Sequence, residues 1–96
     1  MILDESLRKK RNEILQIAKR HGITGIKVFG SAVRGELTPD SDIDFLIEVG
    51  GPTPPWFPGG LVAELSELLE RKIDVVELEA VESDLKSRIL SEATPL

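Results

Sequence analysis

The residues of this chain best suited to chemistry are two aspartates separated by one residue, Asp42 and Asp44. They stand at the start of a largely apolar run, residues 43–49, which is typical of a strand. In a strand, residues two apart point to the same face, about 6.6 Å apart at about 3.3 Å per residue. Both carboxylates can therefore serve one site. Mg²⁺ prefers oxygen ligands and commonly takes one or two carboxylates together with substrate phosphates.

A Gly-Ser pair, Gly30 and Ser31, is separated from Asp42 by ten residues. Glycine lets the backbone approach a phosphate closely, while hydroxyl and backbone N–H groups hydrogen-bond phosphate oxygens. Arg34 either pairs with a triphosphate or is a solvated helix charge, and both alternatives stay open. A phosphate-binding turn beside paired carboxylates predicts an enzyme of metal-dependent phosphoryl or nucleotidyl transfer.

A third carboxylate, Asp74, lies near the start of another apolar run, residues 73–78. If this run is a strand beside 43–49, the two lie about 4.8 Å apart and the three carboxylates share one face. Two unit charges about 4 Å apart repel by about 4 kcal/mol at an effective dielectric of about 20. A divalent cation would turn that repulsion into coordination. The alternative is that Asp42 is a turn residue and Asp44 a solvated charge.

The elements that must position these residues alternate between helix and strand. Apolar spacing predicts a first helix that begins after Asp4 and stops at Gly22. The Pro- and Gly-rich segment 50–60 excludes a helix or a central strand there. The other predicted elements are strand 23–29, a short turn or helix at 31–37, strand 43–49, helix 61–71, strand 73–78 and a last helix capped by Ser83. This order predicts a small α/β (α+β) domain, residues 1–96, with a mixed sheet flanked by helices.

Composition narrows the class of protein. The 96 residues suffice for one modest core, and the formal net charge of −5 argues against nucleic acid as a partner. No apolar stretch approaches the length of a membrane span, and no signal-peptide core stands at the N-terminus. The absence of cysteine excludes disulfides and thiolate metal sites and fits a cytoplasmic protein.

Three segments carry a resemblance to a known family: GSAVRGELTPDSDIDFLIE, RKIDVVELE and the terminal LKSRILSEATPL. Together they resemble the minimal nucleotidyltransferases of the DNA polymerase β superfamily, the MNT-type antitoxins encoded beside HEPN-domain toxins. The most specific part is Gly-Ser, ten residues, then Asp-x-Asp. The resemblance implies a polymerase β-type palm core, metal ligands at Asp42, Asp44 and Asp74, and phosphate contacts at Gly30 and Ser31.

The same resemblance implies Mg²⁺ and ATP, with transfer of AMP to a tyrosine of a partner HEPN toxin, which would make the chain a cytoplasmic antitoxin. About eighteen residues follow the third strand, so we expect the acceptor to arrive on another macromolecule, a protein rather than RNA. A non-catalytic antitoxin that neutralises its partner by complex formation is the alternative. Transfer to a small molecule would need a pocket, which a homodimer could build.

Two aromatic residues, Trp56 and Phe57, lie in the Pro- and Gly-rich segment. Aromatic residues are enriched among interface hot spots, so these two are candidates for contact with a partner or a nucleobase. The alternative is that they fold back onto the core. The basic run at residues 8–11 is interpreted as the solvated face of the first helix, and His21 as a helix-end residue.

Overall fold

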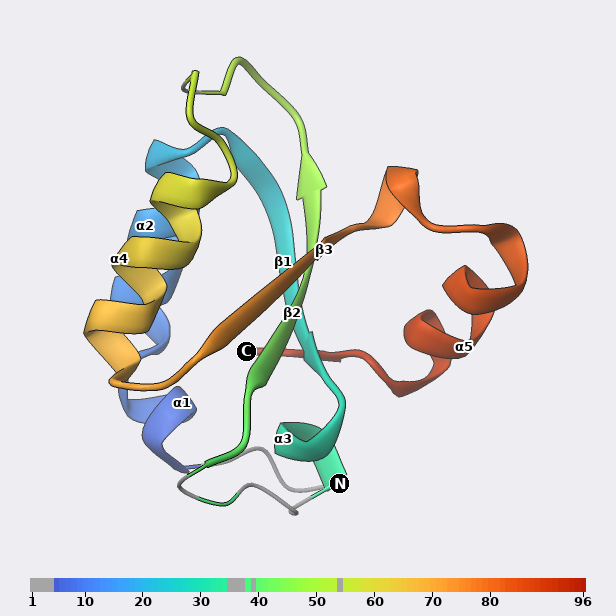
Figure 1. Ribbon diagram of the computed structural model, residues 1–96, viewed down its shortest axis with the longest axis horizontal. Coiled ribbons are helices and arrows are strands. Elements are labelled where there is room, and N and C mark those ends of the chain that lie inside the picture. Colours follow the sequence, from blue (N-terminus) through green and yellow to red (C-terminus); the bar gives the residue numbers. More distant parts are fainter. Residues whose placement is uncertain (1–4, 35–37, 39, 54) are drawn as a thin grey trace.

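Helices lie on both faces of a four-stranded mixed sheet in the computed structural model, which describes residues 5–34, 38, 40–53 and 55–96 (Figure 1). The predicted cap Asp4 and positions 35–37 of the predicted turn lie outside these residues. The helices are α1 (Glu5–Lys9), α2 (Arg11–Arg20), α3 (Ser31–Arg34), α4 (Gly59–Leu69) and α5 (Ser83–Glu92), with a 3₁₀ turn at Leu78–Ala80. The strands are β1 (Ile23–Phe29), β2 (Ile43–Val49), β3 (Ile73–Glu77) and β4 (Thr94–Pro95).

The sheet has the order β3-β2-β1-β4, so β2 lies in its interior as predicted. β1 pairs antiparallel with β2 and with β4, whereas β2 and β3 are parallel and connected through α4. Parallel neighbours begin at the same end of a sheet, and an antiparallel neighbour ends there. The end of β1 and the beginnings of β2 and β3 therefore meet at one end of the sheet.

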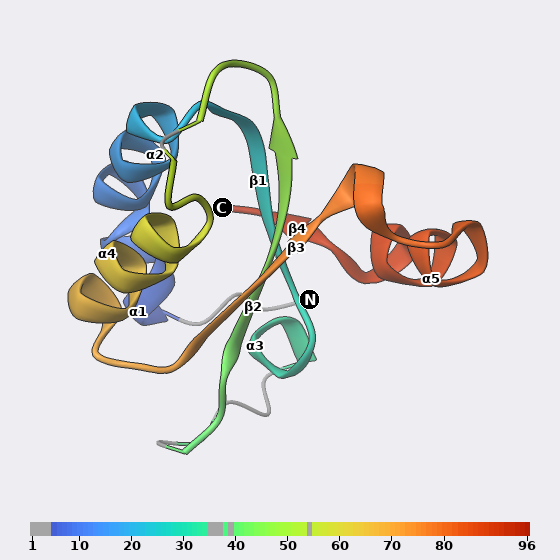
Figure 2. The ribbon, with the colours of Figure 1, turned by 45° about the horizontal axis from the view of Figure 1, so that its top comes forward.

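Alternation along the strands divides the apolar side chains between two clusters. On the first face, α1, α2 and α4 cover the main cluster, which includes the fully buried Ile43, Phe45 and Ile47 of β2. On the second face, Leu46 packs with Ile89 of α5 in a smaller cluster. Figure 2 shows α5 standing apart from the other helices on this second side. Asp42 and Asp44 share the parity of Leu46, so they belong to the less covered face.

The structure corrects several boundaries. The predicted first helix is broken at Lys10 into α1 and α2, although no proline or glycine marks the break. Ser83 is the first residue of α5 and not its cap, because the extended residue before the helix is Glu82. Helix α4 begins at Gly59, inside the predicted loop, and β4 was not predicted at all. Gly22 ends the α2 segment as expected, with a φ of +78°.

Within the part of the chain that the structure describes, no helix is long and apolar enough to cross a membrane.

Candidate active site

The backbone register brings two of the three predicted carboxylates into adjacent positions. Asp44 of β2 pairs with Asp74 of β3 in the parallel ladder, and with Phe29 of β1 on its other side. Paired residues of neighbouring strands point to the same face, at a strand spacing of about 4.8 Å. Asp44 and Asp74 therefore project from the second face at the end of the sheet where β1 stops.

Asp42 lies one residue before β2, in a segment fixed from both sides. Upstream, the backbone N–H of Thr38 donates to the Ser41 hydroxyl at 2.9 Å, and Arg71 donates to the Thr38 carbonyl. Downstream, the N–H of Ile43 donates to the carbonyl of Lys72 at 3.0 Å. These hydrogen bonds link the segment before β2 to the segment before β3, so the backbone is held on both sides of Asp42.

Gly30 presses its backbone against Asp44. Its φ is +77°, a conformation that costs other residues free energy, and a Cβ built on it would lie 2.4 Å from Asp44 Oδ2. Only glycine fits this turn without displacing the carboxylate. The turn continues into α3, where Val33 and Arg34 donate their N–H groups to the Gly30 carbonyl.

The electrostatics of the site centre on Asp44. Partial burial raises its pKa above the ordinary value of 3.8, and the like charges of Asp74 and Asp42 raise it further. Arg34 lowers the pKa of Asp44 and Glu92 raises it, both by smaller amounts. The other two predicted metal ligands differ in solvent exposure: Asp42 is half-buried and Asp74 is exposed. The three carboxylates thus repel one another at one end of the sheet, and a cation would relieve that repulsion.

Carboxylate oxygens are the donors that Mg²⁺ prefers, so the residue types fit this metal. In the conformation described for residues 5–34, 38, 40–53 and 55–96, no group of three His, Cys, Asp or Glu side chains is gathered closely enough to hold an ion. The register supplies the right donors on adjacent strands, and a cation would have to draw the side chains together.

The predicted phosphate contacts lie beside this cluster. Ser31 is the first residue of α3 and Arg34 is its last. The guanidinium of Arg34 donates to Glu92 Oε1 at 2.7 Å, and the backbone N–H of Gly30 donates to the same oxygen. Sequence reasoning missed Glu92, which lies 62 residues after Gly30 and reaches it only because β4 returns to the sheet. No local sequence pattern around Glu92 predicts its contact with Gly30.

The model of the nucleotidyltransferase domain family matches residues 7–96. The chain belongs to this family. Its predicted identity as an enzyme of the nucleotidyltransferase class is thereby confirmed. The matched span contains all six predicted site residues.

Relatives and solved structures agree with this assignment. The chain is 36% identical over 83 residues to MJ0435 of Methanocaldococcus jannaschii, assigned as a protein adenylyltransferase, with 86% of this chain and 89% of that protein covered. It is similar to a structure assigned as a minimal nucleotidyltransferase, with 34% identity, a TM-score of 0.86 and coverage of 99% of this chain and 97% of that one. The predicted fold class and family resemblance are therefore confirmed.

A third likeness is to a Shewanella oneidensis complex of a tri-AMPylated HEPN toxin with an MNT antitoxin. The identity is 18%, the TM-score 0.69, and the match covers 92% of this chain and 69% of that one. At this identity the likeness shows the shared fold alone.

The remaining sequence predictions concern the aromatic pair, His21 and the basic run. Phe57 packs against the main cluster, whereas the side chain of Trp56 is 68% exposed, so only Trp56 remains a candidate contact residue. His21 is the predicted helix-end residue, but it is buried and contacts Glu64 of α4. The basic run is exposed at Arg8, Lys9 and Arg11, as interpreted, and half-buried at Lys10.

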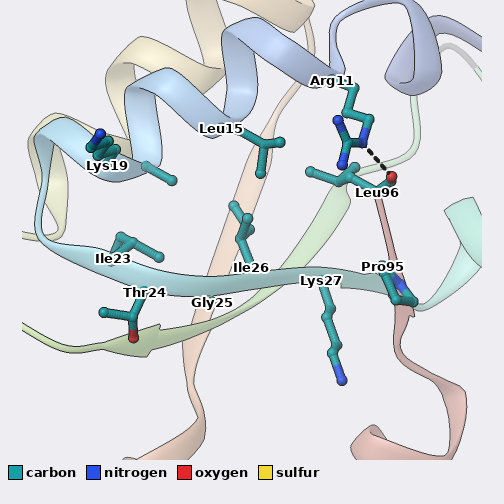
Figure 3. Close-up of a pocket in the computed structure, with 11 residues that line it drawn as sticks. Arg11, Leu15, Lys19, Ile23, Thr24, Gly25, Ile26, Lys27, Pro95 and Leu96 are labelled. Carbon is teal, nitrogen blue, oxygen red and sulfur yellow. Dashed lines mark hydrogen bonds between the residues drawn. The ribbon is translucent and has the colours of Figure 1, made fainter.

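A groove of about 440 Å³ lies between α2 and β1, away from the carboxylates. Figure 3 shows Leu15, Ile26 and Leu96 pointing into it, while Lys27 points away. The Arg11 side chain donates to the Leu96 carbonyl at 2.8 Å and ties the C-terminal segment to α2. None of the predicted site residues lines this groove.

Proposed function

We propose that this chain is a Mg²⁺-dependent nucleotidyltransferase that transfers AMP from ATP to a tyrosine hydroxyl of a partner HEPN toxin. By this modification it acts as an antitoxin. The observation that supports it most is the pairing of Asp44 with Asp74, with the Gly30 backbone against Asp44. Metal-ligand chemistry and a close backbone approach for phosphate then occupy one end of the sheet.

In this proposal Asp42, Asp44 and Asp74 hold Mg²⁺, which offsets the charge that develops on the transferring phosphoryl group. Gly30, Ser31 and Arg34 orient the triphosphate through their N–H, hydroxyl and guanidinium groups. These groups would thus orient the α-phosphorus towards the incoming hydroxyl.

The transfer replaces one oxygen–phosphorus bond with another. The acceptor oxygen bonds to the α-phosphorus, the bond from that phosphorus to the oxygen bridging to the β-phosphate breaks, and pyrophosphate leaves. Asp74 is exposed at the rim of the site, where it is available to take the proton of the acceptor hydroxyl.

A protein acceptor is supported by two independent arguments. The net charge of −5 disfavours a polyanionic acceptor such as RNA. A relative 36% identical is assigned as a protein adenylyltransferase, and a structure of the same fold holds an AMPylated HEPN toxin with its antitoxin. In both cases the group modified with AMP belongs to a protein, which is the acceptor class proposed for this chain.

The test is to incubate the chain with each nucleoside triphosphate, Mg²⁺ and the product of the neighbouring gene, and to weigh both chains by intact mass spectrometry. We expect one or more AMP increments on the partner with ATP, and none with Asp44→Asn. Glu48→Gln is the matched control, because Glu48 lies on the same strand and the same face four residues away. Neutralisation of the toxin that survives Asp44→Asn without any mass increment would support the non-catalytic alternative.

A further inference from the structure

The C-terminal helix places a carboxylate on the groups predicted to bind phosphate. Oxygen Oε1 of Glu92 accepts hydrogen bonds from the Gly30 backbone N–H and from the Arg34 guanidinium. Two donors of different kinds, from the turn after β1 and from α3, thus converge on one anionic oxygen. Such a convergence is the arrangement that recognises a phosphate oxygen as well as a carboxylate.

The position of Glu92 is set by backbone pairing. Glu92 is the last residue of α5, and the chain then enters β4, where Thr94 pairs with Val28 of β1. Val28 lies two residues before Gly30, and Thr94 lies two residues after Glu92. Antiparallel pairing therefore delivers Glu92 beside the Gly30 turn.

The surroundings of Glu92 are otherwise unfavourable for a carboxylate. Its charge is one of those that raise the pKa of Asp44, so it lies within electrostatic reach of the acidic cluster. Like charges at this range destabilise one another, and the contacts with Gly30 and Arg34 offset that cost. The Glu92 side chain is 32% exposed, so a change of rotamer can carry the carboxylate into solvent.

We propose that Glu92 is an autoinhibitory carboxylate, which occupies the phosphate-binding groups of Gly30 and Arg34 and must leave them before a nucleoside triphosphate binds. This inference rests on the proposed function for the identity of the ligand. The observation behind it is the pair of hydrogen bonds to Glu92 Oε1, which the proposed function does not use. The C-terminal segment then sets the affinity of the site for its triphosphate.

The experiment compares binding by isothermal titration calorimetry for the intact chain and for Glu92→Gln and Glu92→Ala. The probes are a non-hydrolysable ATP analogue with Mg²⁺ and, separately, inorganic triphosphate. Glutamine keeps a weaker acceptor, whereas alanine removes the acceptor altogether. We therefore expect affinity to rise about tenfold with Glu92→Ala, the scale of one charge-assisted contact, and by less with Glu92→Gln.

The matched control is Glu82→Gln, which removes the same charge at the other end of α5 and should leave both affinities unchanged. The Gly30 amide resonance in a ¹⁵N correlation spectrum should shift in both Glu92 variants while the rest of the spectrum reports an intact fold. Affinity that stays equal to that of the original chain, or falls, in the Glu92 variants would overturn the inference.

The two probes separate this inference from the proposed function. Tighter triphosphate binding by the Glu92 variants, without AMP transfer to any protein, would support the inference and contradict the proposed function. Binding of neither probe by any of the three proteins would overturn the inference.

Discussion

The carboxylate end of the sheet and the groove between α2 and β1 differ in almost every physical property. The carboxylate end is acidic, with Asp74 exposed, and its residues come from the separate strands β2 and β3. The groove is concave, with Leu15 and Ile26 on its walls and the cations Arg11 and Lys19 among its lining residues. None of the predicted site residues lines this groove.

The difference teaches that the acidic side chains and this groove occupy separate parts of one small fold. The proposed transfer from a nucleotide to a protein needs an accessible face, because the proposed acceptor is itself a macromolecule. On the second face of the sheet Asp74 is exposed, which suits the proposed transfer. The groove instead borders the packing of α2 and Leu96 against β1. Variants in the two regions should therefore behave differently.

The largest separation should come from Asp74→Asn compared with Lys19→Ala. In the proposed function Asp74 is one of three carboxylates that hold Mg²⁺. Its loss would remove several kcal/mol of stabilisation from the transition state, so we expect AMP transfer to slow by about 10³-fold. Lys19 is exposed on the groove side, and its substitution should leave the rate within about twofold. Initial rates from intact mass spectrometry measure both. Equal losses in the two variants would mean that the groove takes part in the reaction.

A second test uses glycines in two environments. Gly30→Ala forces a side chain into a φ of +77° and against Asp44 Oδ2, which should lower the free energy of unfolding by about 2 kcal/mol. Gly59→Ala is the control, because no described atom lies within 4 Å of the position that its new Cβ would take. Chemical denaturation should show a loss for Gly30→Ala alone. A Gly30→Ala protein as stable as the original would contradict the close approach of this turn to Asp44.

The sequence predicted the carboxylate end better than the rest of the molecule, for a physical reason. The alternation around Asp44 and the apolar run after Asp74 are local patterns, and the adjacent strands follow from the βαβ order. Glu92 depends on β4, a pairing of only two residues that no local pattern specifies. The break between α1 and α2 at Lys10 likewise has no proline or glycine that would predict it.

The Pro- and Gly-rich segment shows the same limit on a smaller scale. Its composition excluded regular structure over most of its length, yet it could not tell which of two adjacent aromatic residues would turn inward. Phe57 packs against the main cluster and Trp56 stays exposed, although the two are adjacent residues of the same aromatic class. The sequence therefore predicted the candidate site residues but not the residues, distant in the sequence, that they contact.

A third prediction concerns stability at the carboxylate end. The folded state raises the pKa of Asp44, chiefly by burial and then by Asp74 and Asp42, so ionisation of Asp44 at neutral pH destabilises the fold. Asp44→Asn should therefore raise the melting temperature at pH 7, by up to about 4 °C because solvent screens a partly exposed charge. Glu48→Gln, on the same face, is the control and should leave the melting temperature close to that of the original chain. A lower melting temperature for Asp44→Asn would show that this carboxylate stabilises the metal-free fold.

The smallest effect should appear where α4 contacts the end of α2, with the opposite dependence on acid. There Glu64 of α4 accepts hydrogen bonds from His21 and from Arg20, the latter at 3.0 Å, and fastens α4 to the end of α2. The His21 hydrogen bond, followed by the charges of Arg20 and His21, lowers the pKa of Glu64 below its ordinary 4.5. A depressed carboxylate pKa gives stability that is present above the unfolded pKa and lost as the pH falls through the folded one.

Protonation of Glu64 should thus weaken the fold below pH 4.5, while protonation of Asp44 relieves repulsion at the other end as the pH falls towards 3.8. Melting temperatures measured from pH 6 to pH 3 can separate the effect of Glu64 protonation from that of Asp44 protonation. Glu64→Gln should flatten the acid-induced loss, and Asp44→Asn should steepen it, because the compensating gain is gone. If both variants changed the acid slope in the same direction, the two regions would not hold carboxylates in opposite electrostatic environments.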